Sequence, residues 1–434
     1  MKAPYRGGAA FALALGCASA ILAGAAPGGG GSVVTVTKGP DGYQLLRNGE
    51  PYTVRGAGGE THLELLKAAG GNSIRTWGAE RQGALLDRAH ALGLSVTIGI
   101  WLGHERHGFR YDDPKQVADQ LAQARRFVEQ YRSHPALLLW GVGNEMEASG
   151  GNPAVWKAVN DVARMIQQVD PHHPTMTVVA EIGGSKVPML RRHCPDVDLL
   201  GVNSYGGLAT LPRRLRTAGW DRPYLVTEFG PRGHWEVGKT PWGAPIEPTS
   251  TEKARTYREG YERAVAAQRG WCLGAYAFLW GHKQEATATW FGMLLPVPGG
   301  VERLGAVDAM TYAWTGRWPE NRAPEVEALE CEAGGQEVAP GARLTAEVRA
   351  RDPEGDALTA RWEVRSESAD RREGGDQESL PPAHPESIVE ARGLSLVFRA
   401  PSRPGPYRLF VTLHDGRGSA ATANVPFLVR EASP

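Results

Sequence analysis

The sequence predicts an α/β fold, a (β/α)8 TIM barrel followed by a small all-β, Ig-like sandwich. Between about residues 50 and 316, eight short apolar or β-branched runs alternate with helical patterns, as in parallel β/α units. Eight units in roughly 250 residues is the size of a barrel. An open doubly wound sheet is the alternative, but the glycine-rich residues 56–59 lack the spacing of a phosphate-binding turn.

The first 32 residues are typical of a targeting segment. Lys2 and Arg6 precede an apolar run at residues 9–26 that holds the cleavage-like triplet Ala23-Gly24-Ala25, and a Gly-rich stretch follows. Residues 1–32 are therefore predicted to be a signal peptide and flexible linker, and the chain to be exported, secreted or periplasmic. Cys17, after Leu15-Gly16, also resembles a lipoprotein cleavage site, so a lipid-anchored surface protein stays open as an alternative.

Residues 33–316 carry the barrel. The expected strands are residues 52–56, 73–77, 95–101, 137–142, 175–179, 199–203, 224–227 and 274–279. Helical patterns between them cover residues 63–69, 82–91, 114–131, 155–169 and 252–268, several of them closed by Gly or followed by Pro.

A proline-containing polar stretch at residues 317–324 is predicted to be a linker. Beyond it, at residues 325–434, apolar and polar residues alternate in runs at 344–349, 358–364, 395–399, 407–413 and 422–429. This pattern predicts the β-sandwich. Its acidic turns resemble those of bacterial Ig-like, polycystic-kidney-type or cadherin-like modules, and calcium at Asp352, Glu354 and Asp356 is weighed against a solvated turn.

Composition favours an uncharged ligand. The 48 basic and 48 acidic residues cancel, so no strong net field attracts nucleic acid or anionic lipid. Thirteen tryptophans offer flat faces for sugar rings. Besides Cys17, only three scattered cysteines are present, which excludes a disulfide framework or a cysteine metal site. No cofactor is expected, and the oligomeric state is left open.

Two carboxylates leave the same end of the predicted barrel. Asn144 and Glu145 follow the fourth strand, and Glu228 follows the seventh, where barrel enzymes place their active sites. Glycoside hydrolysis needs one protonated and one ionised carboxyl group. A Glu at a strand end can also form a salt bridge or cap a helix, and for either residue alone that interpretation would be preferred.

The joint pattern resembles the clan of retaining glycoside hydrolases with Asn-Glu after strand four and Glu after strand seven. The resemblance implies Glu145 as acid/base and Glu228 as nucleophile, and it extends to Arg75, Asn203, Tyr205 and Trp280 as residues that orient the nucleophile or line the sugar subsite. Within the clan, endo-β-1,3-glucanases and the barrel of glycoside hydrolase family two are the nearest analogues. The implied function is a retaining β-glycosidase for a neutral β-linked glycan, with a β-1,3-glucan as the best guess.

Further groove residues are expected after strands three and eight. They are Trp101, His104, Trp290 and the run Lys283-Gln284-Glu285. A metal at His104 and His107 is disfavoured, because these histidines are three apart rather than four.

Alternatives to a hydrolase are a transglycosylase that uses the same site, a glycan-binding barrel without catalysis, and a functional sandwich for which the barrel is a scaffold. Because every proposed catalytic residue precedes the linker, the sandwich is expected to be accessory, and a barrel ending near Trp318 is expected to fold and act alone. Retention further predicts carboxyl groups about 5–5.5 Å apart.

Overall fold

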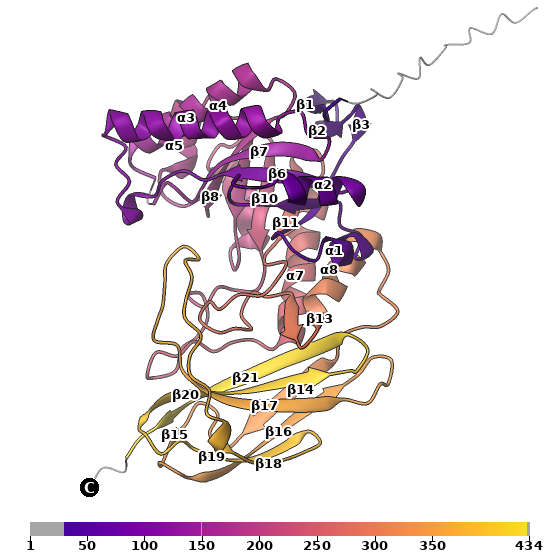
Figure 1. The fold of residues 1–434 in the computed structure, drawn as a ribbon, viewed down its shortest axis with the longest axis vertical. Coiled ribbons are helices and arrows are strands. Elements are labelled where there is room, and N and C mark those ends of the chain that lie inside the picture. The colour runs from indigo at the N-terminus through magenta and orange to yellow at the C-terminus, as the bar shows by residue number, and fades with distance from the viewer. Residues whose placement is uncertain (1–29, 149, 432–434) are drawn as a thin grey trace, which may run out of the picture. The chain divides into compact units, whose positions relative to one another are not determined.

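The fold was analysed in a computed structural model that describes residues 30–148 and 150–431. Eight parallel strands close into a barrel, which confirms the predicted fold class (Figure 1). In chain order they are β4 (Val54–Gly58), β5 (Ser73–Arg75), β6 (Ser95–Ile100), β7 (Leu137–Asn144), β8 (Thr175–Ala180), β9 (Leu199–Asn203), β10 (Tyr224–Phe229) and β11 (Cys272–Ala277). Strand β11 pairs with β4 to complete the ring. The signal peptide predicted for residues 1–32 falls mostly outside the described residues.

The helices follow the strands, as in β/α units. They are α1 (Leu63–Ala68), α2 (Gly83–Ala91), α3 (Pro114–Tyr131), α4 (Pro153–Val169), α5 (Lys186–His193), α6 (Leu211–Thr217), α7 (Ser250–Ala264) and α8 (Gly305–Thr315), with short 3-10 turns η1 (Glu105–His107), η2 (Leu208–Thr210), η3 (Ala266–Gln268) and η4 (Pro385–Ser387). Side-chain caps fix the starts of the long helices. Asp113 caps α3, Asn152 caps α4, and Thr249 with Glu252 forms a capping box on α7.

A small antiparallel sheet closes one end of the barrel. It consists of β1 (Val34–Gly39), β2 (Gly42–Arg47) and β3 (Glu50–Pro51). Val34 and Leu45 are buried against side chains of the barrel strands, and the Val34 N–H donates to the carbonyl of His172, which lies before β8. Because this sheet covers the N-terminal ends of the strands, the opposite end is the one available for a ligand site.

The C-terminal β-region (residues 325–431) contains two sheets around one hydrophobic core. One sheet holds β14 (Glu325–Cys331), β16 (Arg343–Arg351), β18 (Ile388–Arg392) and β19 (Ser395–Arg399). The other holds β15 (Glu337–Val338), β17 (Thr359–Ser366), β20 (Gly405–His414) and β21 (Ser419–Val429). The hairpin of β12 (Leu294–Val297) and β13 (Gly300–Leu304), which precedes the predicted linker, also belongs to this second sheet, since β13 pairs with β21.

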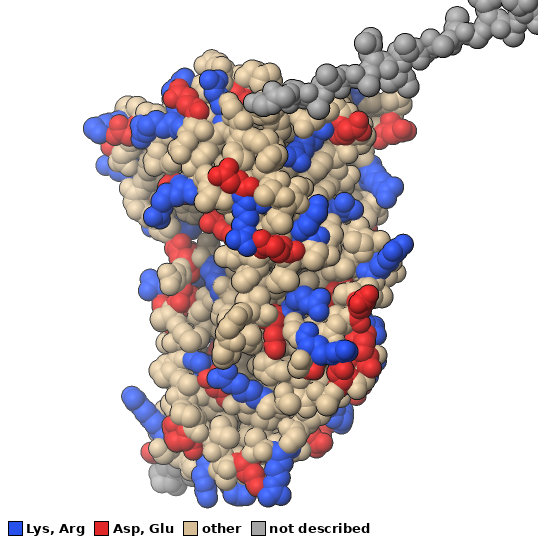
Figure 2. Space-filling model, turned by 45° about the vertical axis from the view of Figure 1, so that its right-hand side comes forward, with Lys and Arg blue, Asp and Glu red and all other residues tan. Residues whose placement is uncertain are grey.

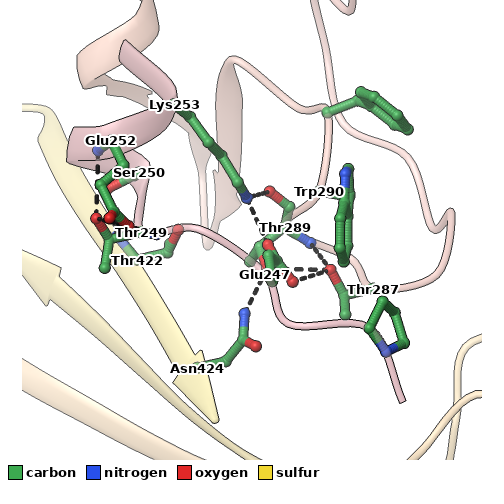
Figure 3. A network of polar contacts seen from close by, with 12 residues as sticks. Glu247, Thr249, Ser250, Glu252, Lys253, Thr287, Thr289, Trp290, Thr422 and Asn424 are labelled. Atoms are coloured by element: carbon green, nitrogen blue, oxygen red, sulfur yellow. Dashed lines mark hydrogen bonds and ion pairs between the residues drawn. The ribbon is translucent and has the colours of Figure 1, made fainter. Parts of the chain in front are cut away.

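Polar contacts join the barrel to the C-terminal β-region. Buried Lys253 of α7 donates to Glu247 at 2.5 Å, and Glu247 also accepts hydrogen bonds from Thr287 and Thr289 (Figure 3). Asn424 of β21 reaches Thr289 from the other side. The Arg408 guanidinium, 1% exposed, donates to the carbonyl of Pro245. The two parts therefore share buried hydrogen bonds that neither could satisfy alone.

In the described chain Cys194 and Cys272 are free and buried, and Cys331 is free and half-buried. Within residues 30–148 and 150–431, no helix is both long and apolar enough to cross a membrane.

Candidate active site

The end of β7 places Asn144 and Glu145 at the open end of the barrel. The β7–β8 pairing is interrupted between Val142 and Asn144, where Gly143 adopts a φ of +71°. Glu145 itself has a φ of +53°, and its N–H donates to the carbonyl of Val178 at 2.9 Å. A non-glycine residue in the left-handed region is uncommon and typical of functional sites. The irregular strand end thus turns the Glu145 carboxyl group towards the barrel axis.

Glu228, on β10, is surrounded by donors. Its Oε1 accepts hydrogen bonds from Arg75 at 2.9 Å and from the Trp77 indole at 2.8 Å, and its Oε2 accepts one from the Tyr205 hydroxyl at 2.8 Å. Burial and the nearby Glu228 carboxylate raise the pKa of Tyr205 well above its usual range, so this hydroxyl stays a donor. Three donors, one of them cationic, suit an ionised carboxylate.

Glu145 has a different environment. Its Oε1 accepts one hydrogen bond, from Asn203 at 2.7 Å. Burial, and next the charge of Glu228, raise the pKa of Glu145 to about 7. This carboxyl group can therefore hold a proton near neutral pH.

A hydrogen-bonded chain connects the two carboxyl groups. Arg75 donates to Glu228 and also to Asn144 Oδ1, at 2.7 Å. Asn203 donates to the same Asn144 oxygen at 3.2 Å and to Glu145. The position of each carboxyl group is therefore coupled to the other through Arg75, Asn144 and Asn203.

Both carboxyl groups open into one cavity of about 700 Å³. Of the residues predicted from the sequence, Glu145, Glu228, Asn144, Asn203, Tyr205, Trp101, Lys283 and Glu285 line it. Trp101 is 40% exposed, which suits an aromatic platform for a sugar ring. Arg75 is buried behind Glu228 rather than at the cavity surface.

Four predicted groove residues lie elsewhere, and one of them, Gln284, lines a separate cavity instead. Trp280 is 1% exposed and donates to the carbonyl of His62, so the prediction that it floors the sugar subsite is wrong. Phe278 and Leu279, just before it, face the cavity instead. Trp290 is fully buried and donates to the carbonyl of Arg232. His104 lies under Trp101, with 4.8 Å between ring centroids, and burial lowers its pKa to about 4. It supports the platform without lining the cavity.

Several lining residues escaped the sequence analysis. Trp77 was detectable, because strand alternation places it on the same face as Arg75. Glu181 was also detectable, because it directly follows β8, whereas Trp235 and Glu236 lie in a loop without a periodic signal. The two proposed catalytic residues precede the linker, but residues 372–376 of the C-terminal β-region line the same cavity, so the site is not confined to the barrel. Figure 1 shows the long connection between β17 and β18 rising from the sheets towards the barrel.

Within the described residues, no group of three or more His, Cys, Asp and Glu side chains is placed to hold a metal ion. In the acidic turn considered for calcium, Glu354 pairs with Arg322 and Asp356 with Arg417.

Residues 61–240 match the family described as "Glycosyl hydrolases family 2, TIM barrel domain". Similar solved structures are a β-D-glucuronidase from Dictyoglomus thermophilum (TM-score 0.53, 18% identity, 67% of this chain and 54% of that chain) and a β-glucuronidase from Ruminococcus gnavus (0.51, 15%, 66% and 53%). The chain spans about half the length of these structures. At such identities the structural likeness shows the fold alone, whereas the family match shows that residues 61–240 are similar to the barrel domain of that family. Of the two analogues expected from the sequence, family two is supported and the endo-β-1,3-glucanases are not.

Proposed function

We propose that the chain is a retaining β-glycosidase in which Glu228 is the nucleophile and Glu145 the general acid/base. One observation carries the proposal: two carboxyl groups share a cavity in unequal surroundings. Glu228 accepts three hydrogen bonds, whereas burial raises the pKa of Glu145 to about 7, so that this carboxyl group can carry a proton near neutral pH. This division of roles is the one that glycoside hydrolysis requires.

The proposed roles imply double displacement. Glu228 attacks the anomeric carbon while Glu145 gives its proton to the leaving oxygen, which produces a covalent glycosyl-enzyme and a released alcohol. Glu145, now ionised, takes a proton from a water molecule that attacks the same carbon and frees Glu228. Arg75 and Tyr205 hold the Glu228 oxygens in place during both steps.

A neutral β-linked glycan is the substrate class we favour. The two structures named above are β-glucuronidases, whose substrates carry a carboxylate. Here the cations on the cavity wall already have acidic partners: Lys283 donates to Glu285 and Arg372 to Asp370. Acidic and basic side chains also alternate over the visible face of the molecule (Figure 2). A β-1,3-glucan remains a prediction from the sequence resemblance, without support from the family match.

A fluorinated aryl β-glycoside tests the mechanism, because it forms the glycosyl-enzyme faster than water releases it. We expect the label on the peptide that contains Glu228. In a separate measurement, proton NMR of an ordinary β-glycoside should show the β anomer as the first product. Glu228→Ala should be inactive, with azide restoring turnover from the opposite face. The α anomer first, or label on another residue, would exclude the proposed roles.

Export of the chain, with residues 1–32 as its signal peptide, and an Ig-like origin of residues 325–434 are further proposals. They rest on the sequence patterns described above. Mass spectrometry of the mature N-terminus would test the first, and would also detect lipid on Cys17.

A further inference from the structure

A tight turn in the loop after β11 presents Glu285 to the active-site cavity. Glu285 and Thr287 exchange backbone hydrogen bonds of 3.1 and 2.7 Å, and Ala286 between them has a φ of +61°. The Glu285 side chain is nearly buried yet lines the same cavity as Glu145 and Glu228. Among the described residues, only Lys283 contacts its carboxylate, through Oε2 at 2.9 Å. The other oxygen, Oε1, accepts no hydrogen bond from the described residues.

The C-terminal β-region holds this turn from outside the barrel. Buried Glu378 accepts a hydrogen bond from the Ala286 N–H at 2.7 Å, across 92 residues of sequence. Lys283 donates to the carbonyl of Gly375 at 2.5 Å as well as to Glu285. Both partners lie in or beside the segment 372–376 that lines the cavity.

The barrel fixes the other end of the turn. The Thr287 hydroxyl donates to Glu247 at 2.6 Å, in the buried network that includes Lys253 (Figure 3). The left-handed conformation of Ala286 strains the backbone, so the turn persists because its neighbours hold it on both sides. A turn held in this way presents its side chain in one orientation.

We infer that Glu285 is a substrate-binding residue that accepts a hydrogen bond from a sugar hydroxyl through Oε1, and that Glu378 is the positioning residue that keeps it there. The inference rests on the proposed function for the identity of the ligand. It makes the C-terminal β-region a wall of the active site. A buried carboxylate that accepts from a hydroxyl discriminates strongly against a sugar that lacks this hydroxyl.

The test measures binding apart from catalysis. In a Glu228→Gln background, calorimetry gives the dissociation constants of neutral β-linked disaccharides and of analogues that lack one hydroxyl each. Adding Glu285→Gln should weaken binding of the best disaccharide by about 10- to 100-fold. One deoxy analogue should be almost insensitive to this substitution, since it lacks the hydroxyl that Glu285 binds. Glu390→Gln, an exposed carboxylate in the C-terminal β-region, is the matched control.

A second variant tests the positioning role of Glu378. Glu378→Ala should weaken binding of the same disaccharide by severalfold and of that deoxy analogue much less. Adding Ala286→Gly should recover part of the loss, because glycine adopts a positive φ without strain. Thermal unfolding would show that each variant is folded.

The outcomes separate the two proposals. If Glu285→Gln weakens every ligand equally or none at all, or if the Glu228→Gln protein binds no member of the panel, the inference is wrong. If wild-type protein hydrolyses none of the disaccharides although the Glu285 effect on binding is present, the proposed hydrolase function fails and the inference stands.

Discussion

Replacing Glu145 with Gln should stabilise the protein, and by an amount that depends on pH. Its pKa rises from an ordinary 4.5 to about 7 because folding buries the carboxyl group beside Glu228. Between these values the folded chain keeps a proton that the unfolded chain has lost, so stability falls as pH rises. The full cost at pH 8 is about 3 kcal/mol, at about 1.4 kcal/mol for each pH unit of displacement. Below pH 4.5 both states are protonated and the cost vanishes.

Urea unfolding followed by tryptophan fluorescence at pH 4.5, 6 and 8 measures this effect. Gln has the same shape as Glu and can still accept the hydrogen bond from Asn203. We expect Glu145→Gln to match wild type at pH 4.5 and to exceed it by about 3 kcal/mol at pH 8. The exposed Glu129→Gln is the control and should show no such trend. A stability difference that is the same at all three pH values would refute the assignment of a raised pKa to Glu145.

Three other predictions concern the site and its support. Tyr205→Phe removes one hydrogen bond from Glu228 and should lower kcat/KM on aryl glycosides by about 10- to 100-fold, while unchanged kinetics would show that this bond is dispensable. Lys253→Met leaves Glu247 buried without its cation and should cost about 3–5 kcal/mol in urea unfolding, so a loss below 1 kcal/mol would contradict the buried pair. Contrary to the expectation from the sequence, a chain ending at Trp318 should not give a stable, active barrel, because the C-terminal β-region contributes hydrogen bonds and part of the cavity wall, and a cooperative melt together with wild-type activity would disprove the shared interface.

The barrel could be predicted from the sequence because its strands are buried on both faces and read as continuous apolar runs. The strand predicted at residues 199–203 has the same bounds as β9, and the helix predicted at 114–131 has the same bounds as α3. The hairpin β12–β13 was missed because its residues are mostly half-exposed and carry Pro296 and Gly299-Gly300, which obscure the strand pattern. Its partner, β21, lies more than a hundred residues away.

The site residues that could be predicted from the sequence are those at the ends of barrel strands. The fold alone brings together four residues that lie at or next to the ends of barrel strands: Asn144, Glu145, Asn203 and Glu228. The prediction for Trp280 was wrong because its backbone N–H donates to the carbonyl of Gly58 in β4, which directs the indole into the core. Loop residues depend on long-range contacts that no local pattern records.

Residues 372–376 of the C-terminal β-region likewise could not be predicted from the sequence as part of the site. Gly374 and Gly375 both have positive φ, and a Cβ on Gly374 would lie 2.5 Å from the Arg106 guanidinium. The positive φ favours glycine at both positions, whereas the Arg106 side chain could move aside for a Cβ. In the sequence, however, two glycines within a polar stretch indicate only a turn.

The parallel pairing of β13 with β21 has a consequence for the order of events during synthesis. A nascent chain that has emerged as far as α8 contains every barrel strand, yet the outer edge of β13 is uncovered and Ala286 lacks Glu378. Because domains begin to fold from the N-terminal side as they emerge, such a chain holds Glu145 and Glu228 on a formed barrel with one wall of the cavity still missing. Strand β21, which is synthesised after every strand of the barrel, is therefore the strand that covers the edge of β13.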